Sequence, residues 1–147
     1  MKSQLLNNAD GQRIFAVVLE QGDEAIACIE RFAAENSLSG AQVTAIGAFS
    51  KAKLQYFDWD NKAYRDIPVD EQAEVASLMG DIALSPEGKP ALHLHAVLGL
   101  RDGRAVAGHF ASGHVRPTLE VLISEAPRHL RKAFDPESGL ALIKPQP

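Results

Sequence analysis

Cysteine and long apolar runs are both scarce in this chain. Its 147 residues include one cysteine, Cys28, so no intrachain disulfide can form and a reducing compartment suits the composition. No run approaches the roughly 18 apolar residues of a membrane span, and the first residues never reach the apolar segment of a secretion signal. The sequence therefore predicts a cytoplasmic protein that has no membrane segment, with Cys28 as a small core residue.

An excess of basic side chains is lacking as well, because the formal net charge is −4. Ordinary nucleic-acid binders neutralise phosphates with lysine and arginine, so this charge argues against that class of protein. The motifs of common enzyme classes are also missing: there is no P-loop, no glycine-rich dinucleotide motif, no nucleophile elbow and no His-Glu-x-x-His. Common nucleotide-binding and hydrolase families are thereby disfavoured.

What the chain does contain is the composition of an ordinary globular protein, with 46% hydrophobic and 23% charged residues. Its length suits one conventional core, and no repeat or linker divides it. We therefore expect a single domain over residues 1–147.

Alternating and β-branched segments that end at turn residues predict a sheet. The predicted strands are 13–20, 42–47, 51–58, 63–67, 74–84, 91–100, 105–111, 118–124 and 139–143. Apolar residues at helical spacing predict one main helix over 23–36, and a short basic segment predicts a helical turn at 128–134. The predicted fold class is α/β, a single-domain sandwich in which one main helix flanks a largely antiparallel sheet.

Glycines and turn residues refine this pattern. Gly80 is expected to interrupt the strand 74–84, and an Asp-Gly pair is expected to turn the hairpin between 91–100 and 105–111. A further hairpin is expected to turn at 58–62, because this segment is rich in turn-forming polar residues.

Four aromatic residues surround the 58–62 turn: Tyr56, Phe57, Trp59 and Tyr64. Core packing is the expected role for two or three of them. The alternative is an exposed group that stacks on a ligand or packs in a subunit interface.

The most informative feature is the pair His93-x-His95, which is followed by His109 on the next predicted strand. Side chains alternate between the faces of a strand, so His93 and His95 point the same way with Cα atoms about 6.6 Å apart. Zinc takes histidine nitrogens at about 2.0–2.1 Å, a distance that such a pair can satisfy. We therefore predict a divalent metal site, with zinc as the expected ion, at His93, His95 and His109. The alternative is a set of packed or hydrogen-bonded sheet histidines.

The position of His109 depends on the hairpin turn before it. A two-residue loop, 102–103, places His95 opposite Phe110, and His109 then faces the wrong side of the sheet. A three-residue loop, 101–103, with a left-handed glycine instead places His95 opposite His109. The metal hypothesis predicts this second register, and Gly108 permits a close approach of the backbone.

Three further residues are candidates for the same site. His114, in an expected loop, is a surface residue or a fourth ligand, while Glu120 and Glu74 are exposed strand residues or carboxylates that orient a ligand histidine. Three histidines leave one coordination position for water or substrate. A metal-dependent enzyme that uses Glu74 or Glu120 as general base is therefore an alternative to a binding module.

Several ordered segments of the chain resemble the plant and prokaryote conserved (PPC) domain family, and together they cover nearly the whole chain. They are VTAIGA at 43–48, GDI at 80–82, PALHLH at 90–95, AGHF at 107–110 and VRPTLEV at 115–121. The resemblance implies an α/β sandwich on a largely antiparallel sheet, a homotrimer, and a family role for His93, His95 and His109. The usual Gly-Gly-His run begins with alanine here, at Ala107.

The family also brings an association with DNA. In plants the domain accompanies an AT-hook in DNA-associated regulators, and prokaryotic members are commonly labelled DNA-binding by similarity. This chain contains no Arg-Gly-Arg-Pro hook to enter a minor groove, so it resembles a stand-alone prokaryotic member. The resemblance implies a trimeric binding or regulatory module with a metal site, whose link to DNA comes from the family alone.

Overall fold

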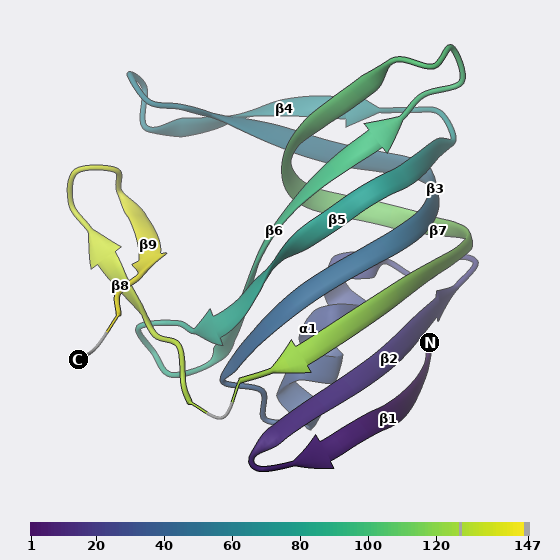
Figure 1. Ribbon diagram of the computed structural model, residues 1–147. Coiled ribbons are helices and arrows are strands. Elements are labelled where there is room, and N and C mark those ends of the chain that lie inside the picture. Colours follow the sequence, from purple (N-terminus) through teal and green to yellow (C-terminus); the bar gives the residue numbers. More distant parts are fainter. Residues whose placement is uncertain (127, 146–147) are drawn as a thin grey trace.

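Alternating apolar and polar side chains give most of the chain an extended conformation (Figure 1). The structure is a computed structural model that describes residues 1–126 and 128–145. Its elements, in chain order, are β1 (Lys2–Ala9), β2 (Gln12–Glu20), α1 (Ala25–Glu35), β3 (Gly40–Asp58), β4 (Ala63–Val69), β5 (Ala73–Leu84), β6 (Pro90–Gly99), β7 (Ala105–Glu125), β8 (Lys132–Asp135) and β9 (Leu140–Ile143).

Seven of these strands form one sheet in the order β1-β2-β7-β6-β5-β3-β4, and β7 also pairs with β3. Every pairing in this sheet is antiparallel. Because β3, β5, β6 and β7 pair in a closed ring, their inward side chains enclose the core. The predicted fold class, a largely antiparallel sheet with one main helix, is confirmed.

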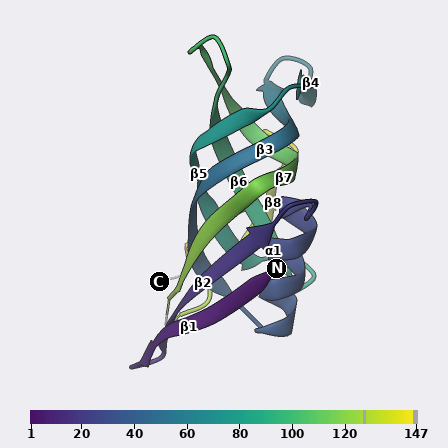
Figure 2. The ribbon, with the colours of Figure 1, turned by 90° about the vertical axis from the view of Figure 1, so that its right-hand side faces the viewer.

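The helix α1 covers one side of this sheet, and the outer surface of β3, β5 and β7 lies on the other side (Figure 2). Glu24 caps the helix, because its carboxylate accepts a hydrogen bond of 2.8 Å from the amide of Ala27. The apolar face of α1 enters the core, where Phe32 packs edge-on against Phe15 with ring centroids 5.2 Å apart. Cys28 is buried in this face, as predicted.

The period of two along β6 decides which side chains reach the core. Leu94, Ala96 and Leu98 are buried. His93 and His95 alternate with them and therefore lie on the outer face of the strand. The same alternation holds for Leu119, Val121 and Ile123 of β7, which all point into the core.

Some predicted boundaries were wrong because long strands bend without ending. The segments 42–47 and 51–58 are parts of one strand, β3, and the segments 105–111 and 118–124 are parts of β7. β3 changes register near Gly47, whose φ is +152°, and so continues past the residues that resemble a turn. β5 also runs on through Gly80 and has its bulge between Val75 and Ser77.

Two elements differ from the prediction at the ends of the chain. β1 was not predicted, since it is exposed on both faces and shows no apolar alternation, although Asp10 and Gly11 turn it back onto β2 with positive φ angles. The predicted helical turn at 128–134 was wrong, because residues 128–131 form no helix and lead into β8, which pairs with β9. No described helix is long and apolar enough to cross a membrane.

Candidate metal site

The turn between β6 and β7 sets the position of the third histidine. The amide of Leu100 donates to the carbonyl of Arg104 at 2.8 Å, and the amide of Gly103 donates to the carbonyl of Leu100 at 3.0 Å. Gly103 is left-handed, with φ of +84°. This is the three-residue loop with its bulge, and it pairs His95 directly with His109, so the predicted register is confirmed.

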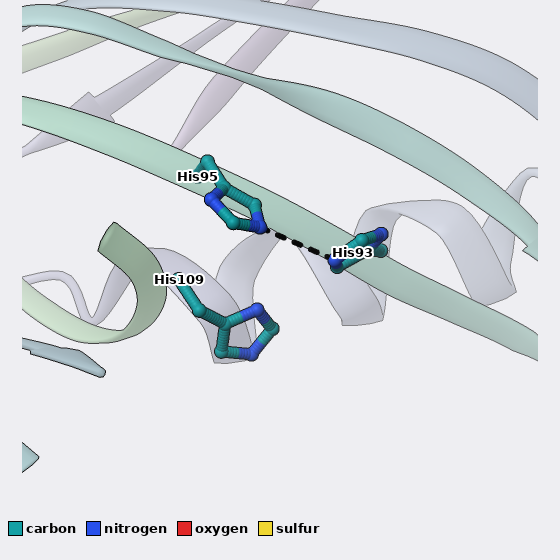
Figure 3. Close-up of side chains that lie close together, drawn as sticks. All are labelled: His93, His95 and His109. Carbon is teal, nitrogen blue, oxygen red and sulfur yellow. Dashed lines mark hydrogen bonds between the residues drawn. The ribbon is translucent and has the colours of Figure 1, made fainter. Parts of the chain in front are cut away.

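The imidazole rings of His93, His95 and His109 face a common point on the outer surface of the sheet (Figure 3). Nε2 of His93 lies 3.3 Å from Nε2 of His95, and one nitrogen from each of the three rings lies within 4.8 Å of the others. Two nitrogens bound at about 2.05 Å to a tetrahedral zinc ion lie about 3.3 Å apart. The spacing of the His93 and His95 nitrogens therefore fits the edge of a zinc tetrahedron.

The surroundings of His109 also fit a metal ligand. Its Nδ1 is buried and has no hydrogen-bond partner among the described residues, which is costly for a polar atom unless something binds it. The ring of Tyr64 on β4 packs over the imidazole with centroids 4.8 Å apart, and this contact fixes the plane of the ring. The donor set and the unpaired nitrogen together suit a divalent ion such as zinc.

The electrostatics of His95 and His109 favour the neutral form of both rings. Burial, helped by the neighbouring His93, His95 and Lys132, lowers the pKa of His109 to about 4. Burial, together with the nearby His93, also lowers the pKa of His95. Both rings are therefore neutral near pH 7 and keep a lone pair for a metal ion.

A carboxylate lies behind the first of these histidines. Asp81 faces His93 across the β5–β6 pairing, with Oδ2 3.6 Å from Nδ1 of the ring. On its other side Oδ1 lies 3.2 Å from Nζ of Lys132, a contact that is ionic but lacks hydrogen-bond geometry. Burial alone raises the pKa of Asp81, but His93 and Lys132 outweigh burial and hold the pKa below its ordinary value. The group is therefore an ionised carboxylate.

Two glycines let the strands around the site approach closely. A Cβ atom on Gly80 would lie 1.9 Å from the carbonyl oxygen of His93, and one on Gly108 would lie 2.6 Å from the carbonyl oxygen of Gln55. Side chains at these positions would push β5 from β6 and β3 from β7. The predicted close approach at Gly108 is confirmed, and Gly80 has the same role.

The other candidate residues do not join the three histidines. His114 lies within β7, where its carbonyl accepts a hydrogen bond from Ser50, so the predicted loop was wrong. Glu120 pairs with Ile46, and Glu74 pairs with Gly99. None of these three belongs to the cluster of metal-binding groups found among the described residues. The carboxylate that lies behind one of the three histidines is Asp81, where the sequence suggested Glu120 or Glu74.

The aromatic residues at the 58–62 turn are largely exposed. Tyr56 is 63% exposed, Trp59 52% and Tyr64 36%, so the expected core packing was wrong for these three. The rings of Phe57 and Tyr64 pack edge-on with centroids 5.2 Å apart, and Lys62 lies over the Trp59 ring. A row of aromatic rings thus leads outward from His109.

Two site residues were not identified as such from the sequence. Asp81 could have been found by counting outward from the turn at 85–89, because Leu84 pairs with Pro90 and the same register brings Asp81 to His93. Lys132 carries no such signal, since it reaches Asp81 from a separate two-stranded sheet far along the chain.

Comparison with known proteins agrees with this fold. The sequence model of the Plants and Prokaryotes Conserved (PCC) domain matches residues 6–127. No curated protein matches the chain.

Three solved structures are similar over most of their length. A metal-containing protein from Archaeoglobus fulgidus is 32% identical, with a TM-score of 0.82, over 90% of this chain and 93% of the other. A plant- and prokaryote-conserved protein from Pyrococcus horikoshii is 25% identical, with a TM-score of 0.84, over 99% of this chain and 96% of the other. A candidate DNA-binding protein from Bacteroides thetaiotaomicron is 25% identical, with a TM-score of 0.84, over 97% of this chain and 96% of the other.

Proposed function

The chain belongs to the Plants and Prokaryotes Conserved domain family, and from that premise we propose that it is a homotrimeric binding module with a divalent metal ion at His93, His95 and His109. Zinc is the first candidate for the ion, because three imidazoles are a common zinc donor set. The observation that carries the proposal is the convergence of the three rings, with one nitrogen from each within 4.8 Å of the others. The metal-containing relative from Archaeoglobus fulgidus supports it.

Residues of the chain itself would bind the ion or orient its ligands. His93 and His95 would bind through their Nε2 atoms, which already lie 3.3 Å apart, while Tyr64 holds the plane of the His109 ring. Asp81 stands behind His93, where a carboxylate raises the basicity of a ligand histidine and fixes its tautomer. When bound, the ion would supply a Lewis-acidic position that polarises a ligand.

Exposure of the site favours a second candidate function, a metal-dependent enzyme. His95 is exposed and the side chain of His93 is 45% exposed, so a fourth coordination position would face solvent and not the core. A purely structural zinc site is typically closed by four protein ligands. Glu74 and Glu120 do not belong to the histidine cluster among the described residues, so neither is placed to act as the general base of such an enzyme.

An uncovered apolar patch supports the homotrimer. It consists of Ile46, Met79 and Leu122, which are 59%, 52% and 49% exposed on the outer face of β3, β5 and β7. Thr44 of β3 pairs with Met79 on one side and with Leu122 on the other, and Ile46 lies two residues further along β3. The three apolar residues therefore form one continuous patch. Large exposed apolar patches mark protein interfaces, and a second copy of the chain is the partner that the family resemblance implies.

DNA is a partner that the family alone suggests. The relative from Bacteroides thetaiotaomicron is described as a candidate DNA-binding protein. The net charge of −4 in this chain works against a phosphate-binding surface. Affinity for duplex DNA that falls steeply with added salt would support this partner, and binding that is absent at low salt would exclude it.

The metal proposal is tested by titrating zinc into chelator-treated protein. Wild type should bind about one ion per chain, and His95→Ala should lose most of the affinity because it removes one of three ligands. His114→Ala is the matched control, since His114 lies on β7 outside the cluster, and should bind as wild type does. Equal zinc affinity in wild type and His95→Ala would contradict the proposal.

A further inference from the structure

The two-stranded sheet at the end of the chain, β8 and β9, lies outside residues 6–127, the range that the family model matches. It stands apart from the main sheet in Figure 1, and the chain leading into it contacts the end of β5. There the amide of Leu84, at the end of β5, donates to the carbonyl of Leu130 at 2.8 Å, and Leu84 forms a parallel bridge with Arg131. This C-terminal hairpin is thus docked on the strand that carries Asp81.

One side chain of the C-terminal hairpin reaches the histidine site. Lys132 is the first residue of β8, and its side chain is 6% exposed. Its ammonium lies 3.2 Å from Oδ1 of Asp81 and donates to the carbonyl of Ala91 at 3.4 Å. Ala91 lies on β6, two residues before His93. A buried lysine is rare without ionic partners, so this contact holds the hairpin against the two strands of the site.

The contacts form a chain from the hairpin to a proposed metal ligand. Lys132 contacts one oxygen of Asp81, and the other oxygen lies 3.6 Å from Nδ1 of His93. The opposite nitrogen of that ring, Nε2, is the one that faces His95. An imidazole that binds metal through Nε2 usually donates its Nδ1 hydrogen to a carboxylate, and this outer partner strengthens the metal site.

We propose that Lys132 and Asp81 are positioning residues for His93, and that through them metal binding and docking of the C-terminal hairpin stabilise each other. The inference rests on the proposed metal function. Lys132 holds the Asp81 carboxylate in place, and Asp81 turns Nε2 of His93 toward the ion. Since coupling between two sites is reciprocal, an ion that tightens the His93–Asp81 contact also holds the hairpin more firmly on β5.

Amide hydrogen exchange and zinc affinity of the full chain test the coupling together. In wild type, zinc should slow exchange at Leu84, whose amide bonds to Leu130 at the docking point, and in peptides that cover residues 131–144. Lys132→Met keeps the apolar stem and removes the charge. It should weaken zinc binding by about tenfold or more and abolish the effect of zinc on hairpin exchange. Lys144→Met, an exposed lysine of the same segment, is the matched control and should change neither.

Asp81→Asn is a second variant that keeps the shape of the side chain. It tests the proposal independently if Lys132→Met does not fold. It should weaken zinc binding to a similar extent and shift the visible spectrum of the cobalt-loaded protein, a readout that a purely structural role would leave unchanged. If wild type binds zinc but hairpin exchange is the same with and without it, or if Lys132→Met binds zinc as tightly as wild type, the coupling is overturned and the metal site stands. A wild type that binds no zinc overturns both.

Discussion

At the scale of single residues, the unusual atom is Nδ1 of His109. A buried polar atom without a partner costs roughly 1–3 kcal/mol, and such atoms are few in folded proteins. The low pKa of His109 has the same origin, because burial penalises the imidazolium form. Both features are explained if the ring is held ready for a cation other than a proton.

The pKa of His109 has a consequence for the stability of the metal-free protein. This pKa is about 4 in the folded chain and 6.5 in its ordinary state, so between these values the unfolded chain binds more protons than the folded one. The free energy of unfolding should therefore fall as the pH is lowered from 6.5 toward 4, and His95, whose pKa is also lowered, adds to this trend. The ring is only half-buried, so solvent screening reduces the size of the effect.

Urea denaturation of chelator-treated protein, at one protein concentration and several pH values, measures this slope. His109→Gln removes the titrating ring and should give a shallower dependence on pH than wild type in the same window. An equally steep decline in His109→Gln would assign the acid sensitivity to other groups.

At the scale of elements, the hairpin of β6 and β7 shows how much of the site the sequence could predict. The two-residue spacing placed His93 and His95 on one face, but the Asp-Gly turn left two registers open for His109. The observed register is the one that the metal hypothesis requires. Asp81 was within reach of the same counting argument. Lys132 was not, because its contact depends on how a separate sheet docks, and no local pattern encodes that.

Dependence on distant contacts also explains why β1 was not predicted and why β3 and β7 were each predicted as two strands. Local patterns locate turns well, but β3 and β7 bend at bulges and continue, since their partners on both sides maintain the hydrogen bonds. β1 has no buried face and hence no alternation to detect. Pairing with distant segments is what makes these residues strands.

Gly103 in the turn between β6 and β7 can be tested by substitution. Its φ of +84° suits glycine and is tolerated by asparagine, but it strains a β-branched residue. Gly103→Val should lower the free energy of unfolding by about 1–2 kcal/mol and weaken zinc binding, since the turn sets the position of His109. Gly103→Asn is the control and should stay close to wild type in both measurements. Wild-type behaviour of Gly103→Val would show that the other pairings of β7 fix the register without the turn.

At the scale of the whole molecule, the exposed patch of Ile46, Met79 and Leu122 is expected to be covered by further copies of the chain. Ile46→Glu places a charge in the middle of that surface and should convert the trimer to monomer, because an unpaired charge is costly in an apolar interface. Leu5→Glu, on the exposed edge strand β1, is the control and should leave the trimer intact. Sedimentation equilibrium measures the mass. A wild type that is monomeric, or a trimeric Ile46→Glu, would contradict the assignment of this surface.

Met79 also pairs with His95, so the patch and the histidines share one face of the sheet. If the trimer forms there, the metal site lies at the rim of the interface. The mass and the metal content of one preparation should therefore be measured together.

Elemental analysis of protein purified without chelator tests the central claim most directly. Wild type should contain about one divalent ion, zinc first among them, per chain, and His93→Ala, prepared in parallel and checked for the same oligomeric mass, should contain almost none. Wild-type protein that is free of metal would contradict the claim that His93, His95 and His109 form a metal site.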